Sequence, residues 1–204
     1  MASLLSLTGT LHEAVVFGRR TRVLSERILP LFPANARVID VGAGDGTIAS
    51  LWQKTRPDLC VEGIDVLVRP DTKVPVREFD GRTIPYSNKS ADVVVFVDVL
   101  HHTDDPLPLL REAARVARKK IVVKDHFSEN FLDHSTLRLM DWVGNAAHGV
   151  ALPYNYLSRA AWQRLFAEAA LRQKGAELRL PLYPFPASLI FGRALHFIAD
   201  LQPS

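Results

Sequence analysis

Hydrophobic positions along this chain form two patterns that alternate with one another. Short continuous runs rich in valine and isoleucine are typical of strands buried on both faces. These runs lie at residues 38–41, 60–66, 93–97 and 121–124. Longer stretches with apolar residues every three or four positions are typical of amphipathic helices. These stretches lie at residues 11–31, 48–54, 106–118, 128–147 and 159–171. Pro30 and Pro33 would stop the first of these helices, and Ser158 would cap the last. Strands that alternate with helices predict an α/β fold around a parallel sheet.

Three weaker segments predict the remaining strands. Residues 74–79 are short and interrupted by Pro75, which favours an edge strand because proline cannot donate to a sheet ladder. Residues 176–180 alternate between polar and apolar, and residues 195–199 form another apolar run. We expect these last two segments to close the sheet as an antiparallel pair.

The composition of the chain excludes only a few classes of protein. The chain has 204 residues, 48% hydrophobic and 23% charged, which suits one globular domain with a sizeable core. A net charge of +3 does not by itself indicate a nucleic-acid partner. The single cysteine, Cys60, suits a reducing compartment, and the apolar runs are too short to span a membrane. We therefore expect a cytoplasmic protein.

The residues suited to binding a nucleotide-like cofactor are concentrated at positions 38–47. An acid, Asp40, stands inside the apolar run, and Gly42, Gly44 and Gly46 follow it at every second position. Glycines between a strand and a helix let the chain turn tightly and let a nucleotide approach the backbone. Thr47 stands where a dinucleotide fingerprint needs its third glycine, and the lysine of a P-loop is missing.

With Asp40 and its three glycines, this stretch resembles the first motif of class I S-adenosylmethionine-dependent methyltransferases. The resemblance continues in chain order over roughly residues 25 to 125. It runs through Asp65, Asp80-Gly81, Ile84-Pro85, the strand end Asp98 to His102, the helix Glu112 to Val116 and the fifth strand. It implies a Rossmann-like three-layer αβα sandwich. The expected sheet has seven strands, mostly parallel, with an antiparallel last strand.

The resemblance also implies the cofactor, S-adenosylmethionine, and the parts of it that each segment holds. Asp40 and the glycine turn would hold the methionine part, Asp65 the ribose hydroxyls and Asp80 the adenine. The strand end at Asp98 to His102 would line the sulfur. The expected cofactor-binding residues are Asp40, Gly42, Ala43, Gly44, Gly46, Asp65, Val66, Asp80, Gly81, Asp98, Val99 and His102.

The acceptor side is expected in a helical and loop insert at about 127–157, within a single domain spanning 1–204. His134, Arg138, Asp141 and Asn145 share one face of its helix, a pattern that suits either a substrate pocket or a solvated surface. His126, Asp141 and His148 are the candidate general bases. A metal site at His101, His102, Asp104 and Asp105 is possible by residue type, but neighbouring residues rarely converge on one ion, and we expect no metal.

The expected function is methyl transfer from S-adenosylmethionine to a small-molecule acceptor, by a monomer or a homodimer without a membrane or nucleic-acid partner. Three alternatives stay open at this point. An RNA methyltransferase would keep the cofactor but need a basic face that carries aromatic residues. A nicotinamide-dependent oxidoreductase would use the same corner, although Thr47 and Asp80-Gly81 argue against it. A non-catalytic partner subunit would keep the fold and the cofactor alone.

Overall fold

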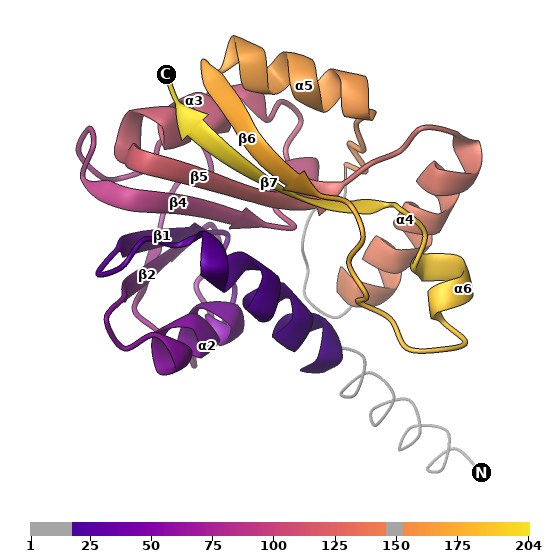
Figure 1. Ribbon diagram of the computed structural model, residues 1–204, viewed down its shortest axis with the longest axis horizontal. Helices are drawn as coiled ribbons and strands as arrows, with labels where there is room; N and C mark the ends of the chain where they lie inside the picture. Colours follow the sequence, from indigo (N-terminus) through magenta and orange to yellow (C-terminus); the bar gives the residue numbers. More distant parts are fainter. Residues whose placement is uncertain (1–17, 146–152) are drawn as a thin grey trace.

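A seven-stranded sheet forms the centre of the computed structural model, which describes residues 18–145 and 153–204 (Figure 1). Its strands in spatial order are β3-β2-β1-β4-β5-β7-β6. Their bounds are β1 (Arg37–Val41), β2 (Cys60–Asp65), β3 (Val76–Glu78), β4 (Ala91–Val97), β5 (Ala117–His126), β6 (Leu171–Glu177) and β7 (His196–Pro203). All neighbours are parallel except β7, which runs antiparallel to both β5 and β6. The predicted sheet with its antiparallel last strand is confirmed.

Helices cover both faces of the sheet and make the expected three layers. The helix at residues 18–28 and α2 (Thr47–Thr55) cover one face, and α3 (Leu107–Val116) and α5 (Arg159–Glu168) cover the other (Figure 1). Two further helices, α4 (Phe131–Asn145) and α6 (Ser188–Phe191), lie beyond the carboxyl end of β5. The part of the chain that the structure describes also has two single 3-10 turns, η1 (Leu29–Leu31) and η2 (Leu100–His102).

The valine-rich runs fold as central strands because both of their faces are buried. In β4, Val94 and Phe96 point into the core under α3 and α5, while Val93 and Val95 point into the core under α2. All four side chains are fully buried. Because successive side chains of a strand point to opposite faces, one continuous apolar run contributes to both cores, as expected for a covered parallel strand.

Several predicted boundaries are confirmed together with their physical cause. Ser158 caps α5, and its hydroxyl accepts a hydrogen bond from the backbone N–H of Ala161 (3.2 Å). The short β3 lies at the edge of the sheet, as its proline predicted. Leu24 and Ile28 of the first helix are fully buried, and Pro30 falls where that helix tightens into η1. The part of the predicted 11–31 helix before residue 18 lies outside the described residues.

Two strand assignments were wrong. The predicted helix extended to Arg118 and the next strand began at residue 121, but Arg118 to Lys120 belong to β5, where Arg118 and Lys119 pair with Asp92 at 3.1 and 3.0 Å. Charge pairing across the sheet end explains how a basic run is held in a strand. The sixth strand occupies Leu171–Glu177 rather than 176–180, because its solvent-facing edge position leaves it without the apolar alternation that was sought.

Candidate functional site

The glycine turn after β1 has the geometry that its spacing predicts. Gly42, Gly44 and Gly46 all have positive φ, between 59° and 75°. A side chain on Gly42 would lie 2.4 Å from Val99 Cγ2, and one on Gly46 would lie 2.8 Å from Val74 Cγ2. A side chain on Gly44 would meet nothing within 4 Å. Two glycines therefore serve packing, while the third presents bare backbone to open space, where a ligand can approach.

Asp65 braces this turn from the end of β2. Its Oδ2 accepts a hydrogen bond from the backbone N–H of Gly44 (2.8 Å), and its Oδ1 accepts one from Leu67 (2.9 Å). Asp40 is buried in the neighbouring strand, and burial together with the charge of Asp65 raises the pKa of Asp40 to about 8. Asp40 therefore carries a proton near neutral pH.

Asp80 and Gly81 lie beside Asp65, as a shared cofactor cleft requires. A side chain on Gly81 would lie 3.1 Å from Val66 Cγ1, which places the two strand ends in contact. Asp80 Oδ1 accepts hydrogen bonds from the backbone N–H groups of Arg82 (2.8 Å) and Thr83 (2.7 Å). These bonds lower the pKa of Asp80, so it presents a charged carboxylate at the rim.

The end of β4 joins the glycine turn to the acceptor side. Val99 packs against Gly42, and the backbone N–H of His102 donates to the carbonyl of Val99 (3.0 Å) within η2. His102 is half-buried, and its Nδ1 has no hydrogen-bond partner among the described residues. Burial and the nearby charge of His101 lower the pKa of His102, so its imidazole is neutral.

Asp98, predicted to touch the cofactor, is enclosed by two cations. Its Oδ2 pairs with Arg20 from the first helix and its Oδ1 with Lys124 from β5. Asp98 has a positive φ of 57°, an uncommon backbone conformation for a residue with a side chain. Burial opposes ionisation of Asp98, but the charges of Lys124 and Arg20 hold its pKa well below the usual range.

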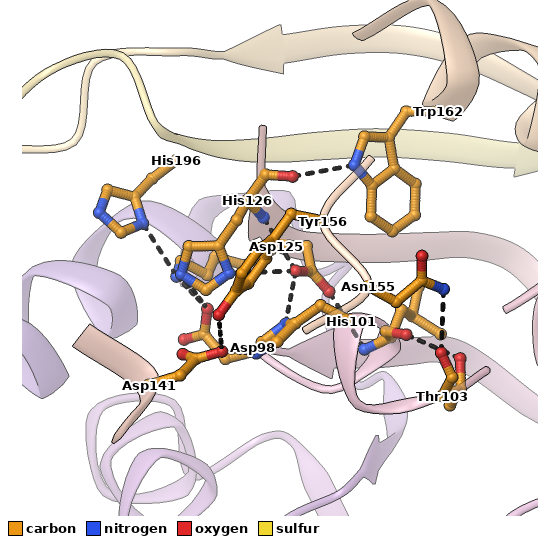
Figure 2. A network of polar contacts seen from close by, with 12 residues as sticks. Asp98, His101, Thr103, Asp125, His126, Asp141, Asn155, Tyr156, Trp162 and His196 are labelled. Atoms are coloured by element: carbon orange, nitrogen blue, oxygen red, sulfur yellow. Dashed lines mark hydrogen bonds and ion pairs between the residues drawn. The ribbon is translucent and has the colours of Figure 1, made fainter. Parts of the chain in front are cut away.

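A second chain of charges runs from β5 to the helical insert (Figure 2). Asp125 Oδ1 accepts from His101 Nδ1 at 2.7 Å, His101 Nε2 lies 3.3 Å from Asp141 Oδ2, and the hydroxyl of Tyr156 donates to that same oxygen of Asp141. Burial disfavours the imidazolium of His101, but Asp125 and Asp141 outweigh it and raise its pKa to about 10. His101 is therefore a cation held between two carboxylates.

The predicted bases occupy different environments. His126 is buried, with Nδ1 3.2 Å from Asp125 and Nε2 3.5 Å from Asp98. Burial and the charge of Lys124 lower its pKa well below the usual range, so it is neutral. Asp141 belongs to the chain of charges just described. His148 lies outside the described residues.

Three residues of the predicted polar stripe of α4 contact other parts of the protein, although Arg138 is exposed, and the side chain of Asn145 lies outside the described ones. Asp141 contacts His101, the guanidinium of Arg138 lies 4.6 Å from the ring centroid of Tyr154, and the rings of His134 and Tyr156 are 5.4 Å apart. The loop that carries these tyrosines is fixed in turn, because Asn155 donates to the carbonyl of Thr103 (3.0 Å) beside η2 (Figure 2). The insert therefore closes over the ends of β4 and β5.

Besides Asp125, sequence reasoning missed four members of this buried cluster: Arg20, Lys124, Tyr156 and His196. His196 Nδ1 lies 3.5 Å from Lys124 Nζ at the start of β7. A lysine at the end of an otherwise apolar strand was the one available indication, because a fully buried ammonium needs a carboxylate partner. The other three have no local pattern that marks them.

Among the described residues, the side chains close enough to chelate a metal differ from the set that the sequence suggested. His101, Asp125 and His126 bring ligand atoms within 4.8 Å of one another. His101, however, is a cation here, and Lys124 and Arg20 add two more positive charges nearby. Such charges oppose metal binding, so the absence of a metal stays our prediction.

Comparisons with known proteins agree with this geometry. The model of a protein family described as a methyltransferase domain matches residues 16–172 of this chain. The 27-O-demethylrifamycin SV methyltransferase of Amycolatopsis mediterranei is 30% identical over 121 residues, which cover 52% of this chain and 44% of that relative. The chain thus spans less than half the length of this curated relative.

Two solved structures share the fold. One is the putative methyltransferase in complex with the Trm112 methyltransferase activator of Haloferax volcanii, with a TM-score of 0.68 and 17% identity, covering 95% of this chain and 96% of that one. The other is a possible histamine N-methyltransferase of Thermotoga maritima, with a TM-score of 0.65 and 16% identity, covering 97% and 96%. At these sequence identities, the similarity to the two structures supports the fold alone.

The family match covers most of the chain, and the sheet order, the glycine turn and the strand-end acids agree with it. Membership implies S-adenosylmethionine as the cofactor, and the bare backbone at Gly44 beside charged Asp65 and Asp80 fits that group. The chain belongs to the class I S-adenosylmethionine-dependent methyltransferases.

Proposed function

We propose that this protein transfers the methyl group of S-adenosylmethionine to a hydroxyl or amine of a small-molecule acceptor. The observation that carries the proposal is the glycine turn, whose Gly44 is bonded to Asp65 and faces open space. The acceptor class rests on the likeness to an enzyme named for a small molecule, 27-O-demethylrifamycin SV. Among the described residues, no helix is long and apolar enough to cross a membrane.

The cofactor side keeps the residue assignments made from sequence, with one refinement. Asp40 and residues 42–46 hold the methionine part, Asp65 and Val66 the ribose, and Asp80 and Gly81 the adenine. Asp98 contributes indirectly in this proposal, because both of its oxygens are already engaged by Arg20 and Lys124. It fixes the backbone from which Val99 and His102 reach the sulfur end.

The sulfonium supplies an activated methyl group, so the protein mainly aligns the acceptor and excludes water. Removal of the acceptor proton needs an unprotonated basic group near the sulfur end. His102 meets both conditions, since it is neutral, half-buried and one turn away from the glycine corner. We therefore place His102 as the general base. His126, Asp141 and His148 remain the weaker candidates, and buried His126 would need the insert to open.

Calorimetric titration with S-adenosylhomocysteine tests the cofactor assignment. The wild type should bind, and Asp65→Asn should bind at least tenfold more weakly, because one charged acceptor for the ribose hydroxyls is lost. Asp58→Asn is a matched control, since Asp58 pairs with Arg56 at the surface, away from the sheet's carboxyl ends. No binding by the wild type would overturn the proposal.

The base assignment has a separate test once an acceptor is found by screening hydroxylated and aminated small molecules. His102→Gln should lower kcat about 100-fold or more and remove the acid limb of the pH profile. An unaltered pH profile would contradict the role of His102.

Two of the alternatives keep their own tests. An RNA acceptor predicts RNA affinity that weakens steeply with salt. The partner-subunit alternative predicts cofactor binding without turnover in any acceptor screen, and the Haloferax volcanii neighbour, described in complex with an activator, makes a co-purification experiment worthwhile. Family membership removes the nicotinamide oxidoreductase alternative.

A further inference from the structure

Large apolar side chains gather on the outer side of the helical insert. Seven of them are between 51 and 85% exposed on α4, on α6 and on the loop before α6. They are Phe131, Leu132, Leu139, Trp142, Phe185, Leu189 and Ile190, here called the α4–α6 surface. The only other large apolar residues exposed in this way in the described chain are Val66, Leu67 and Val68, beside the glycine turn.

The two parts of the α4–α6 surface lie at the same end of the molecule (Figure 1). At 100° per residue, Phe131, Leu132, Leu139 and Trp142 fall within one arc of α4, opposite buried Asp133 and Leu137. Arg193, just after α6, joins this segment to the buried side of α4. Its guanidinium lies 3.3 Å from Asp133 and donates to Thr136 (2.7 Å). Figure 1 shows α4 and α6 together at one end of the molecule.

We propose that the α4–α6 surface is the interface between two copies of this chain. Three of the seven side chains are aromatic, which bury about 150–250 Å² each when covered, and four are leucine or isoleucine; their exposed parts together amount to roughly 800 Å². Each partner of a standard interface contributes about 800 Å². The area fits what a stable dimer needs.

The charges around the surface favour a second copy over a membrane. Within α4 and residues 184–193 the basic residues are Arg138 and Arg193. Arg138 stacks on Tyr154 and Arg193 pairs with Asp133. Peripheral membrane binding usually adds several free lysines or arginines to an apolar face. A two-fold interface instead places each residue near its own symmetry equivalent, which an apolar surface without free charges tolerates.

The proposed interface lies on a different face of α4 from the one that contacts the acceptor side. Asp141 points from α4 toward His101, and the next residue, Trp142, belongs to the α4–α6 surface. Pairing of two copies would therefore hold the helix that closes over the ends of β4 and β5. The dimer proposal does not depend on the acceptor, and cofactor binding can be measured separately from it.

Sedimentation equilibrium over a concentration series tests the proposal. The wild type should be a dimer, and Leu139→Glu and Leu189→Glu should each raise the dimer dissociation constant at least 100-fold, because both copies would bury the new charge. Ala160→Glu, on the exposed face of α5, is the control and should leave the dissociation constant unchanged. Circular dichroism and S-adenosylhomocysteine titration establish that each variant is folded.

Three outcomes would overturn the proposal. One is a wild type that stays monomeric across the series, and another is a dimer whose dissociation constant neither glutamate changes. The third is a monomer that co-sediments with vesicles of phosphatidylcholine and phosphatidylserine through the same side chains, which would assign the surface to a membrane. Failure to bind S-adenosylhomocysteine with an intact dimer would instead count against the cofactor assignment alone.

Discussion

The two halves of the sheet's carboxyl edge are built in different ways. On the β1–β3 side, the residues proposed for the cofactor come from three short consecutive segments, and backbone hydrogen bonds shape them. Gly44 donates to Asp65, and Asp80 accepts from Arg82 and Thr83. On the β4–β5 side, side chains from Arg20 to His196 form one buried cluster of charges. The first half is made locally and the second is assembled from the whole chain.

The electrostatics of the halves differ accordingly. The β4–β5 cluster balances its charges, with Arg20, Lys124 and His101 positive and Asp98, Asp125 and Asp141 negative. The β1–β3 side leaves the charges of Asp65 and Asp80 at a partly open rim, without a cation in the contacts described above. A closed, neutral cluster gives rigidity, whereas acids at an open rim leave polar capacity for a ligand.

Breaking the buried cluster should have the largest effect on stability. Lys124→Met removes the fully buried ammonium and leaves Asp98 paired with Arg20 alone, so the free energy of unfolding should fall by about 3–5 kcal/mol. Urea unfolding measures this. Lys120→Met, in the same strand but with a partly exposed pair to Asp200, should cost only about 0–1 kcal/mol. Equal losses in the two variants would mean that the cluster has no special role in stability.

Altering the glycine turn should have a somewhat smaller effect. Gly42→Ala imposes a side chain at φ 75° and 2.4 Å from Val99 Cγ2, for a combined loss of about 2–4 kcal/mol in unfolding free energy. Adding Val99→Ala should recover the part that comes from overlap. Gly175→Ala is the control, because a side chain there meets nothing within 4 Å. A Gly42 variant as stable as the wild type would show that the turn adapts freely.

The smallest expected effect is on the pH dependence of cofactor binding, which tests the β1–β3 side of the site. Because the pKa of Asp40 is raised to about 8, Asp40 is protonated below that pH, and an ammonium on the ligand favours its charged form. Affinity for S-adenosylhomocysteine should therefore rise with pH toward 8, by up to about tenfold per pH unit, and then level off. Asp40→Asn should abolish this rise. A calorimetric series at several pH values would refute the idea if the two proteins behaved alike.

The β1–β3 half of the site could be found from sequence because its cause is local. Three glycines at alternate positions force the turn, and an acid after each apolar run marks the strand end. The valine-rich strands and the cap at Ser158 were found for the same reason. The two incorrect strand assignments, at Arg118 to Lys120 and in the sixth strand, both involve contacts with another strand or with solvent that no local pattern records.

By itself, the sequence determined the fold class, the family resemblance and the segments proposed to hold the cofactor, because periodicity and glycine spacing act over a few residues. Only the tertiary structure decided that Asp98 lies between Arg20 and Lys124 and that His101 is a cation between Asp125 and Asp141. The charge state of a buried group depends on the partners that folding brings to it from distant parts of the chain, and no short stretch of sequence contains them.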